Sequence, residues 1–322
     1  MSHRGLLAAA VAVLSALACP SLAGASPYVH AHRGGPLATV GGVQVPQHPE
    51  NTLPAFEAAA ADGYVLELDV KLTSNRVPVV IHDATLNRTT DCAGRVSAIT
   101  AARLRAECEV DLLGTSGNSL PLPPGDPRRT VVPALAEALA LARDAGASVN
   151  LEIKNIPLLE PDFDITNRFA DAVVNVILAS RFPPSRLIVQ SFWPLNLDVV
   201  ERRLPTAETS LLTLRDPPAP LNHFGPVFAD LRGYEWVSPQ WPIDPASATT
   251  GIYIAEAHAL GLRVVPFTLD NPGGVKAATR AGVDAVITND PGMARAAIKE
   301  VAPEPPAPPP PPTDGQCAAA RA

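Results

Sequence analysis

The chain has 322 residues, of which 47% are hydrophobic, so it is long enough to bury the core of one large α/β domain, and disorder of its main body is excluded. Its formal net charge of -7 argues against nucleic-acid binding, because polyanions are normally bound by a basic face. An acidic protein can still bind an anionic substrate if a cation bridges them.

The first 25 residues are typical of a signal peptide. Their start is weakly positive, residues 6–17 are apolar, and Ala23-Gly24-Ala25 offers small residues for cleavage. The apolar run is too short to span a bilayer comfortably. Lipoprotein processing at Cys19 is the alternative, but Ala16 stands where that motif has a larger aliphatic residue. We expect a secreted or extracytoplasmic protein.

Export changes how the cysteines are interpreted, because thiols in an oxidising compartment tend to pair. Cleavage after Ala25 leaves Cys92, Cys108 and Cys317. The first two lie 16 residues apart around a polar stretch, so we expect a Cys92–Cys108 disulfide, worth about 3 kcal/mol in the chain-entropy model. Two free buried thiols are the alternative for a cytosolic chain. Cys317 is left over.

Apolar, β-branched runs bounded by turn residues recur along the chain and are typical of buried parallel strands. Alanine-rich stretches with helical character lie between them. The alternation predicts a parallel α/β architecture, and about eight repeats predict a (β/α)8 TIM barrel. The predicted strands are 28–32, 64–70, 79–82, 148–153, 187–190, 209–213, 236–238, 263–268 and 285–288, and the predicted helices are 53–61, 134–145, 168–178, 252–260 and 274–281.

Nine predicted strands compete for eight places in such a barrel, and residues 236–238 form the shortest of them. Residues 71–78, between the second and third strands, leave no room for a helix. They form either a hairpin or an extended connector, which could reach about 26 Å and recross the barrel wall. We expect the connector to recross, because a hairpin would place His82 at the end opposite to Glu67.

The domain organisation follows from composition. Residues 26–300 form the catalytic domain, with a loop or small subdomain at about 92–129 that ends in a Pro/Gly-rich stretch. Residues 301–322 form a disordered, proline-rich tail of polyproline character. Such a tail could hold the domain away from a surface.

Side chains that could catalyse acid/base chemistry or bind a metal lie toward the ends of the predicted strands. Glu67 and Asp69 point the same way on an extended strand, as do His30 and His32, because side chains alternate faces. Two imidazoles, those of His32 and His82, could therefore meet the carboxylate pair in one site. Metal-assisted acid/base chemistry uses these groups.

Motifs in a fixed order support this interpretation. The chain is identified on them as a member of the glycerophosphodiester phosphodiesterase family, whose fold is a TIM barrel of the phospholipase C-like phosphodiesterase type. The resemblance covers about residues 28–298. The motifs are His32-Arg-Gly34, Pro49-Glu-Asn-Thr52, Glu67-Leu-Asp69, His82-Asp-Ala-Thr-Leu-Asn-Arg-Thr-Thr90, Leu151-Glu-Ile-Lys154, Gln190-Ser-Phe192 and Ile287-Thr-Asn-Asp-Pro291.

The resemblance implies hydrolysis of a glycerophosphodiester to an alcohol and sn-glycerol 3-phosphate. It implies a role for each matching residue. His32 and His82 would be the general acid/base pair; Glu67, Asp69 and Glu152 would bind the metal; Arg33 and Lys154 would contact the phosphodiester oxygens; Glu50 would support the site. His30 has no such match and is expected to pack or to support.

The chemistry is consistent with one divalent cation. Three carboxylates are hard oxygen ligands that suit Ca2+ or Mg2+. The cation would polarise the phosphoryl group, while one imidazole deprotonates the nucleophile and the other protonates the leaving alkoxide. The sequence leaves open which histidine does which, and whether water or the glycerol hydroxyl attacks first.

Two departures from the family pattern concern the mouth of the barrel. Residues 35–48 are longer than the family's usual connection and could narrow or cover the mouth. Phe267-Thr-Leu-Asp270 stands in the place of a Trp-Thr-Val-Asn pattern, which changes the expected shape of the glycerol pocket.

Three functions compete on this evidence. The first is the secreted, metal-dependent diesterase acting on a small glycerophosphodiester, with no nucleic acid or obligate protein partner and with possible cell-envelope association. The second is a phospholipase D-like enzyme acting on lysophospholipid or sphingomyelin, for which residues 35–48 and Trp193 are the hints. The third, a non-catalytic binding barrel at the cell surface, is disfavoured because both histidines and all three carboxylates are present.

Overall fold

The computed structural model describes residues 26–35, 37–40, 43–114, 119–157, 159–214, 224–243 and 248–302. The expected signal peptide, Cys19, Cys317 and nearly all of the proline-rich tail lie outside these residues. Within them, no helix has the length and apolar character needed to cross a membrane.

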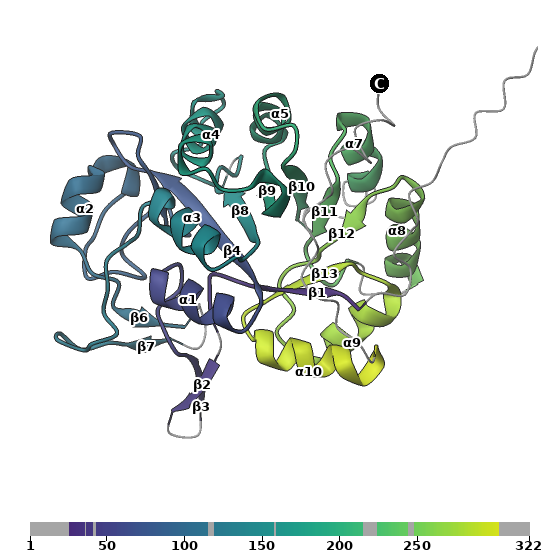
Figure 1. The fold of residues 1–322 in the computed structure, drawn as a ribbon, viewed down its shortest axis with the longest axis horizontal. Helices are drawn as coiled ribbons and strands as arrows, with labels where there is room; N and C mark the ends of the chain where they lie inside the picture. The colour runs from purple at the N-terminus through teal and green to yellow at the C-terminus, as the bar shows by residue number, and fades with distance from the viewer. Residues whose placement is uncertain are drawn as a thin grey trace, which may run out of the picture.

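Eight parallel strands form the predicted TIM barrel, with helices around the outside (Figure 1). Their order in the sheet is β12-β11-β10-β9-β8-β4-β1-β13. The barrel closes between its first and last members through backbone hydrogen bonds from Asp284 N to Val264 O (3.0 Å) and from Ile287 N to Pro266 O (3.0 Å). The strands are β1 Tyr28–Ala31, β4 Val65–Leu72, β8 Val149–Ile153, β9 Leu187–Ser191, β10 Glu208–Thr213, β11 Trp236–Pro239, β12 Arg263–Val264 and β13 Ala285–Thr288.

All nine predicted runs contain strands, and the short run at 236–238 is a barrel strand. The run outside the barrel is the one at 79–82, where β5 Pro78–Val80 pairs with β4 in antiparallel fashion. The expectation of a recrossing connector is therefore wrong, because residues 71–78 include a hairpin turn. β4 continues to Leu72, beyond the carboxylates, and β5 returns only as far as Asp69, whose carbonyl accepts from Ile81 N at 2.9 Å. His82 thus stays at the same end as Glu67.

The outer helices include all five predicted ones. They are α1 Leu53–Ala61, α3 Leu135–Asp144, α4 Arg168–Ser180, α5 Pro194–Arg203, α7 Gly225–Arg232, α8 Ala248–Ala259, α9 Pro272–Ala281 and α10 Pro291–Val301. Helix α10 takes in Val301, which the sequence assigned to the tail. Local signals start the last two helices, because the side chains of Asn271 and Asp290 each cap a helix whose first turn contains proline.

The insertion after β5 is a small folded unit with its own apolar cluster. It contains the 3-10 turn η1 Val96–Ala98, helix α2 Ala101–Glu107, and the short paired strands β6 Leu112–Leu113 and β7 Leu120–Pro121. The Cys92 and Cys108 sulfurs lie 2.04 Å apart, the bonding distance of the expected disulfide. Thus the region predicted as a loop or subdomain packs against Val79 in β5 and against Ile81, which follows β5.

The long connection at 35–48 forms a two-stranded hairpin. Its strands β2 Leu37–Val40 and β3 Val43–Pro46 are antiparallel. In Figure 1 this hairpin projects from the barrel below α1.

Candidate active site

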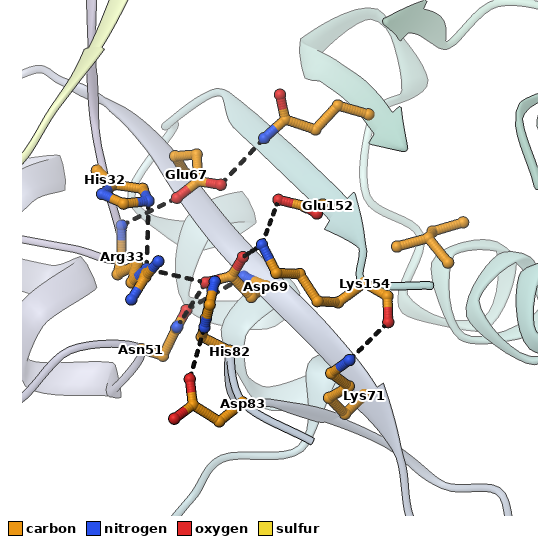
Figure 2. Close-up of polar contacts among 12 residues, drawn as sticks. His32, Arg33, Asn51, Glu67, Asp69, Lys71, His82, Asp83, Glu152 and Lys154 are labelled. Carbon is orange, nitrogen blue, oxygen red and sulfur yellow. Dashed lines mark hydrogen bonds and ion pairs between the residues drawn. The ribbon is translucent and has the colours of Figure 1, made fainter. Parts of the chain in front are cut away.

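The candidate side chains meet at the carboxyl ends of the barrel strands (Figure 2). His32 and Arg33 follow β1, Glu67 and Asp69 lie in β4, and Glu152 lies in β8. His82 joins them at the end of β5, and Lys154 follows β8. This is the end of a TIM barrel at which catalytic sites are built.

Three buried carboxylates form the centre of the site. Glu67 and Asp69 share one face of β4, and the strand register places Asp69 beside Glu152 of β8. One oxygen from each of the three lies within 4.8 Å of the others, and their exposed fractions are 5% or less. The predicted metal-ligating set is therefore assembled in space.

Two carboxylate oxygens in this set make no hydrogen bond within the part of the chain that the structure describes, and the ion pair of one of them, Asp69 Oδ1, with Lys154 Nζ is long, at 3.4 Å. Asp69 Oδ1 and Glu152 Oε1 are buried, and neither has a hydrogen-bond partner among the described residues. A buried anionic oxygen without a partner is costly. Hard oxygens converging within this distance suit Ca2+ or Mg2+, so the residues present fit the divalent cation that the sequence predicts.

Arg33 and Lys154 lie against the carboxylates. Lys154 Nζ donates to Glu152 Oε2 at 3.0 Å and lies 3.4 Å from Asp69 Oδ1. Arg33 Nε lies 3.3 Å from Asp69 Oδ2, and Arg33 Nη1 donates to Glu50 at 3.2 Å. Both cations are largely buried, so their charge acts at short range with little screening by water.

The same burial gives the carboxylates unequal acidity. Burial, with Asp69 and Glu152 nearby, holds the pKa of Glu67 well above its ordinary value. Burial also raises the pKa of Glu152 to about 7, against the opposing effect of Lys154. Although burial opposes it, the pKa of Asp69 is held well below its ordinary value by Lys154, His82 and Arg33. Asp69 is thus the most acidic carboxyl group of the three.

A buried polar network beneath the carboxylates orients Glu67. Arg33 N donates to Glu67 Oε2 and Gln190 Nε2 donates to Glu67 Oε1, each at 3.0 Å. Gln190 in turn accepts from Asn150 Nδ2, which also lies 3.2 Å from His30 Nδ1. Burial lowers the pKa of His30 to about 3, so this ring stays neutral and supports the site.

His32 is held through its Nδ1 atom by a neutral group. Nδ1 lies 2.7 Å from Asn289 Oδ1, at the end of β13. On the other side of the ring, Arg33 Nε donates to Nε2 at 3.2 Å. Burial first, and the nearby Arg33 charge second, hold the pKa of His32 well below its ordinary value.

His82 is also held through its own Nδ1 atom, but by a charged group. Its Nδ1 lies 2.6 Å from Asp83 Oδ1. Arg88 donates to both oxygens of Asp83 and to both oxygens of Glu50. Burial lowers the pKa of His82, and the carboxylates of Asp69 and Asp83 oppose this shift. Glu50 links Arg88 to Arg33.

The backbone is unusual where the first two motifs meet. Arg33 and Asn51 both have left-handed backbone conformations, with φ of 59° and 57°. Asn51 N donates to the Arg33 carbonyl at 2.7 Å, and the Asn51 side chain bonds Asp69 through both its Nδ2 and Oδ1 atoms. Non-glycine residues rarely adopt this conformation, and such residues cluster at active sites.

The fold brings together the acid/base, metal-binding, phosphate-binding and supporting side chains that the sequence nominated, and their roles stay predictions. The sequence assigned no role to several others that hold these residues in place. Each of those was visible inside a motif already quoted, but the motif alone does not show what its polar side chain contacts. The added residues are Asn51, Asp83, Arg88, Gln190 and Asn289.

Comparisons with known proteins agree with this geometry. Residues 32–293 match the model of the glycerophosphoryl diester phosphodiesterase family. A glycerophosphodiester phosphodiesterase from Bacillus altitudinis is 28% identical over 251 residues, covering 77% of this chain and 91% of the relative.

Solved structures show the same fold. A structure from Silicibacter pomeroyi has a TM-score of 0.69 at 25% identity, covering 86% of this chain and 94% of the other. An Oleispira antarctica phosphodiesterase, solved in complex with the product sn-glycerol-3-phosphate, has a TM-score of 0.65 at 24% identity, covering 85% of this chain and 97% of the other.

Proposed function

Because the chain belongs to the glycerophosphoryl diester phosphodiesterase family and is a phosphoric diester hydrolase, we propose that it cleaves glycerophosphodiesters with a divalent cation and a pair of histidines. The products would be an alcohol and sn-glycerol 3-phosphate. The observation that supports this most strongly is the placement of two oriented imidazoles around one buried three-carboxylate centre.

Glu67, Asp69 and Glu152 would hold the cation. The two buried oxygens without hydrogen-bond partners, Asp69 Oδ1 and Glu152 Oε1, support this assignment. When bound, Ca2+ or Mg2+ would polarise a phosphoryl oxygen of the substrate. Gln190 and Asn51 keep Glu67 and Asp69 in the required orientation.

Arg33 and Lys154 would bind the phosphodiester. Both side chains lie at the carboxylate centre and carry more N–H donors than their present contacts use. Charge that develops on the phosphoryl oxygens in the transition state would be stabilised by these buried cations.

The two histidines would have different roles because their Nδ1 partners differ. The Asp83 carboxylate favours a positively charged ring, so we assign His82 as the general acid that protonates the leaving alkoxide. The Asn289 carboxamide carries no charge and Arg33 disfavours a second cation, so His32 would be the general base that deprotonates the nucleophile through Nε2.

We also propose that the protein acts outside the cytoplasm, free or associated with the cell envelope. The signal-peptide character of residues 1–25 supports this, and so does the pairing of Cys92 with Cys108, because disulfides persist in oxidising compartments. Thiol labelling of the exported protein would test it. The expected result is no labelling of Cys92 or Cys108 before reduction, whereas full labelling of both would contradict export to an oxidising compartment.

The direct test of function is release of glycerol 3-phosphate from glycerophosphocholine. The protein lacking residues 1–25 would be assayed with Ca2+, with Mg2+ and with a chelator. We expect release that the chelator abolishes and that both His32→Ala and His82→Ala lower by at least about 100-fold. Turnover that persists in chelator would contradict the metal assignment, and turnover unchanged in either variant would contradict the histidine assignment.

A further inference from the structure

Asp270, which lies beyond β12 in the segment that departs from the family pattern, is connected to the site through Asn289. Asn289 Nδ2 donates to Asp270 Oδ2 at 2.6 Å, and Asn289 N donates to Asp270 Oδ1 at 2.8 Å. The other end of the same carboxamide, Oδ1, lies 2.7 Å from His32 Nδ1. The carboxamide therefore bridges an exposed carboxylate and a ring of the active site.

The hydrogen bonds that connect Asp270, Asn289, His32 and Arg33 can each run in only one direction, which the groups at the two ends of the series determine. An ionised carboxylate can only accept, so the Asn289 amide nitrogen must face Asp270 and the amide oxygen must face His32. A carbonyl oxygen can only accept, so the His32 proton must be on Nδ1. At the far end Arg33 can only donate, which requires the lone pair of His32 on Nε2.

We propose that Asp270 is a positioning residue which, through the Asn289 carboxamide, holds His32 in the tautomer with its proton on Nδ1 and its lone pair on Nε2. The inference rests on the proposed function, because only a ring whose Nε2 carries no proton can take a proton from the nucleophile at that atom. Without Asp270, the Asn289 carboxamide can rotate and present its NH2 group to the ring. That would favour the opposite tautomer.

A purely structural role for Asp270 is the competing explanation. Besides Asn289, it accepts from Thr288 Oγ1 at 3.3 Å, so it also ties the loop after β12 to the end of β13. The test must therefore read the state of the His32 ring directly, and not stability alone.

The first measurement is 15N–1H NMR of the histidine rings in the wild-type protein and in Asp270→Ala. The His32 signal is identified by its loss in His32→Gln. We expect a Nδ1-protonated ring in the wild type and a shift toward Nε2 protonation in Asp270→Ala. An unchanged Nδ1-protonated ring in a folded Asp270→Ala variant would overturn the proposal.

Kinetics give the second readout. Asp270→Ala should lower kcat with glycerophosphocholine by about tenfold, the scale of one hydrogen bond, with little change in KM. Asp198→Ala is the matched control, because Asp198 lies on α5 and accepts from the Tyr234 hydroxyl at 2.9 Å, a contact outside the chain of hydrogen bonds that ends at His32. The control should keep its kcat even if its unfolding temperature falls. An equal fall of kcat in both variants would overturn the proposal.

An exchange of the two side chains sharpens the test. In the double variant Asp270→Asn with Asn289→Asp, the amide introduced at position 270 can donate to the carboxylate introduced at position 289, and that carboxylate can accept from His32 Nδ1. The Nδ1-protonated tautomer should return. The carboxylate now beside the ring should raise the pKa of His32, so the acid limb of the kcat/KM profile should move to higher pH.

The outcomes distinguish this inference from the function on which it rests. If the wild type releases no glycerol 3-phosphate, the proposed function fails, and the NMR comparison still decides the role of Asp270 without substrate. If the wild type turns over and the exchange variant does not recover the Nδ1-protonated ring, the inference fails while the function stands.

Discussion

The two halves of the barrel bury very different side chains at their strand ends. In the first half, β1, β4 and β8 bring three carboxylates, an arginine and a lysine together in one buried centre. In the second half, β10 and β11 carry small buried hydroxyls, and those of Ser210 and Ser238 are hydrogen-bonded to each other at 2.6 Å. The second half contributes the carboxamide of Asn289 to the site, and Asp270 bonds that carboxamide.

Each half has its own apolar cluster, so the difference is not one of packing. One cluster lies between the early strands and α1, α3, α4 and α5, and the other between the late strands and α7 to α10. The difference is that like charges are buried at close range in the first half, which opposes folding unless the charges are compensated. Function and stability should therefore respond to mutation differently in the two halves.

The largest expected effect is on turnover, in the first half. Glu152→Gln keeps an oxygen to accept from Lys154 but puts an amide group in place of the second carboxylate oxygen. Turnover of glycerophosphocholine should fall by about a thousandfold, because one of the three proposed ligands of the cation is removed. The unfolding temperature should stay the same or rise, since one of three clustered carboxylates is removed.

Glu107→Gln is the control for that comparison. Glu107 pairs with Arg103 at 2.8 Å on the surface of α2, away from the site. Its replacement should change neither the turnover of glycerophosphocholine nor the unfolding temperature. A marked loss of stability in Glu152→Gln would contradict the contrast between the halves, because it would show that this charge stabilises the fold.

The next largest expected effect is a loss of stability caused by a substitution in the second half of the barrel. Ile254 on α8 is 1% exposed and belongs to the cluster of the late strands. Ile254→Ala should lower the free energy of unfolding by about 3 kcal/mol through lost burial and the cavity left behind. Chemical denaturation would measure this, and Ile254→Val should lower the free energy of unfolding by about a third as much as Ile254→Ala. Without denaturant, both variants should keep the turnover of the wild type.

The disulfide tests whether the insertion is independent of both halves. Replacing Cys92 and Cys108 by serine together opens a loop of 16 residues and should cost about 3 kcal/mol or less, depending on how cooperatively the insertion unfolds with the barrel. Denaturation followed by tryptophan fluorescence and by circular dichroism would measure this. Coincident transitions shifted to lower denaturant are expected, and an unchanged midpoint would show that the insertion unfolds separately.

The smallest effect concerns a histidine away from the site. The hydrogen bond to Asp284 raises the pKa of His258 above its ordinary value, and partial burial opposes this. A raised pKa in the folded state gives stability that is present below the ordinary pKa of 6.5 and lost as the pH rises through the raised value. His258→Gln should therefore destabilise the protein more at pH 5.5 than at pH 9, by less than about 1 kcal/mol. An equal loss at both values would remove the charge-based explanation.

Much of the barrel was predictable because its strands and helices carry local signals. Buried parallel strands are continuous apolar runs, and the five predicted helices have alanine-rich sequences. Among the helices that were not predicted, α5, α7 and α10 each have proline in the first turn, a start signal that their mixed composition obscured. The sequence left the β4–β5 hairpin as one of two alternatives and favoured the wrong one, because the length of a strand beyond the barrel edge depends on what it packs against.

Hydrophobic periodicity and ordered motifs are local properties of the chain, so they were enough to predict the fold class and the family and to nominate the residues that the fold brings together. The tertiary structure alone decided how those residues act on each other. Glu67 and Glu152 are 85 residues apart, and His32 and Asn289 are 257 residues apart, so neither spacing reveals a contact. The unequal acidity of the carboxylates and the different Nδ1 partners of His32 and His82 arise from burial and from which groups the closed barrel brings within hydrogen-bonding distance.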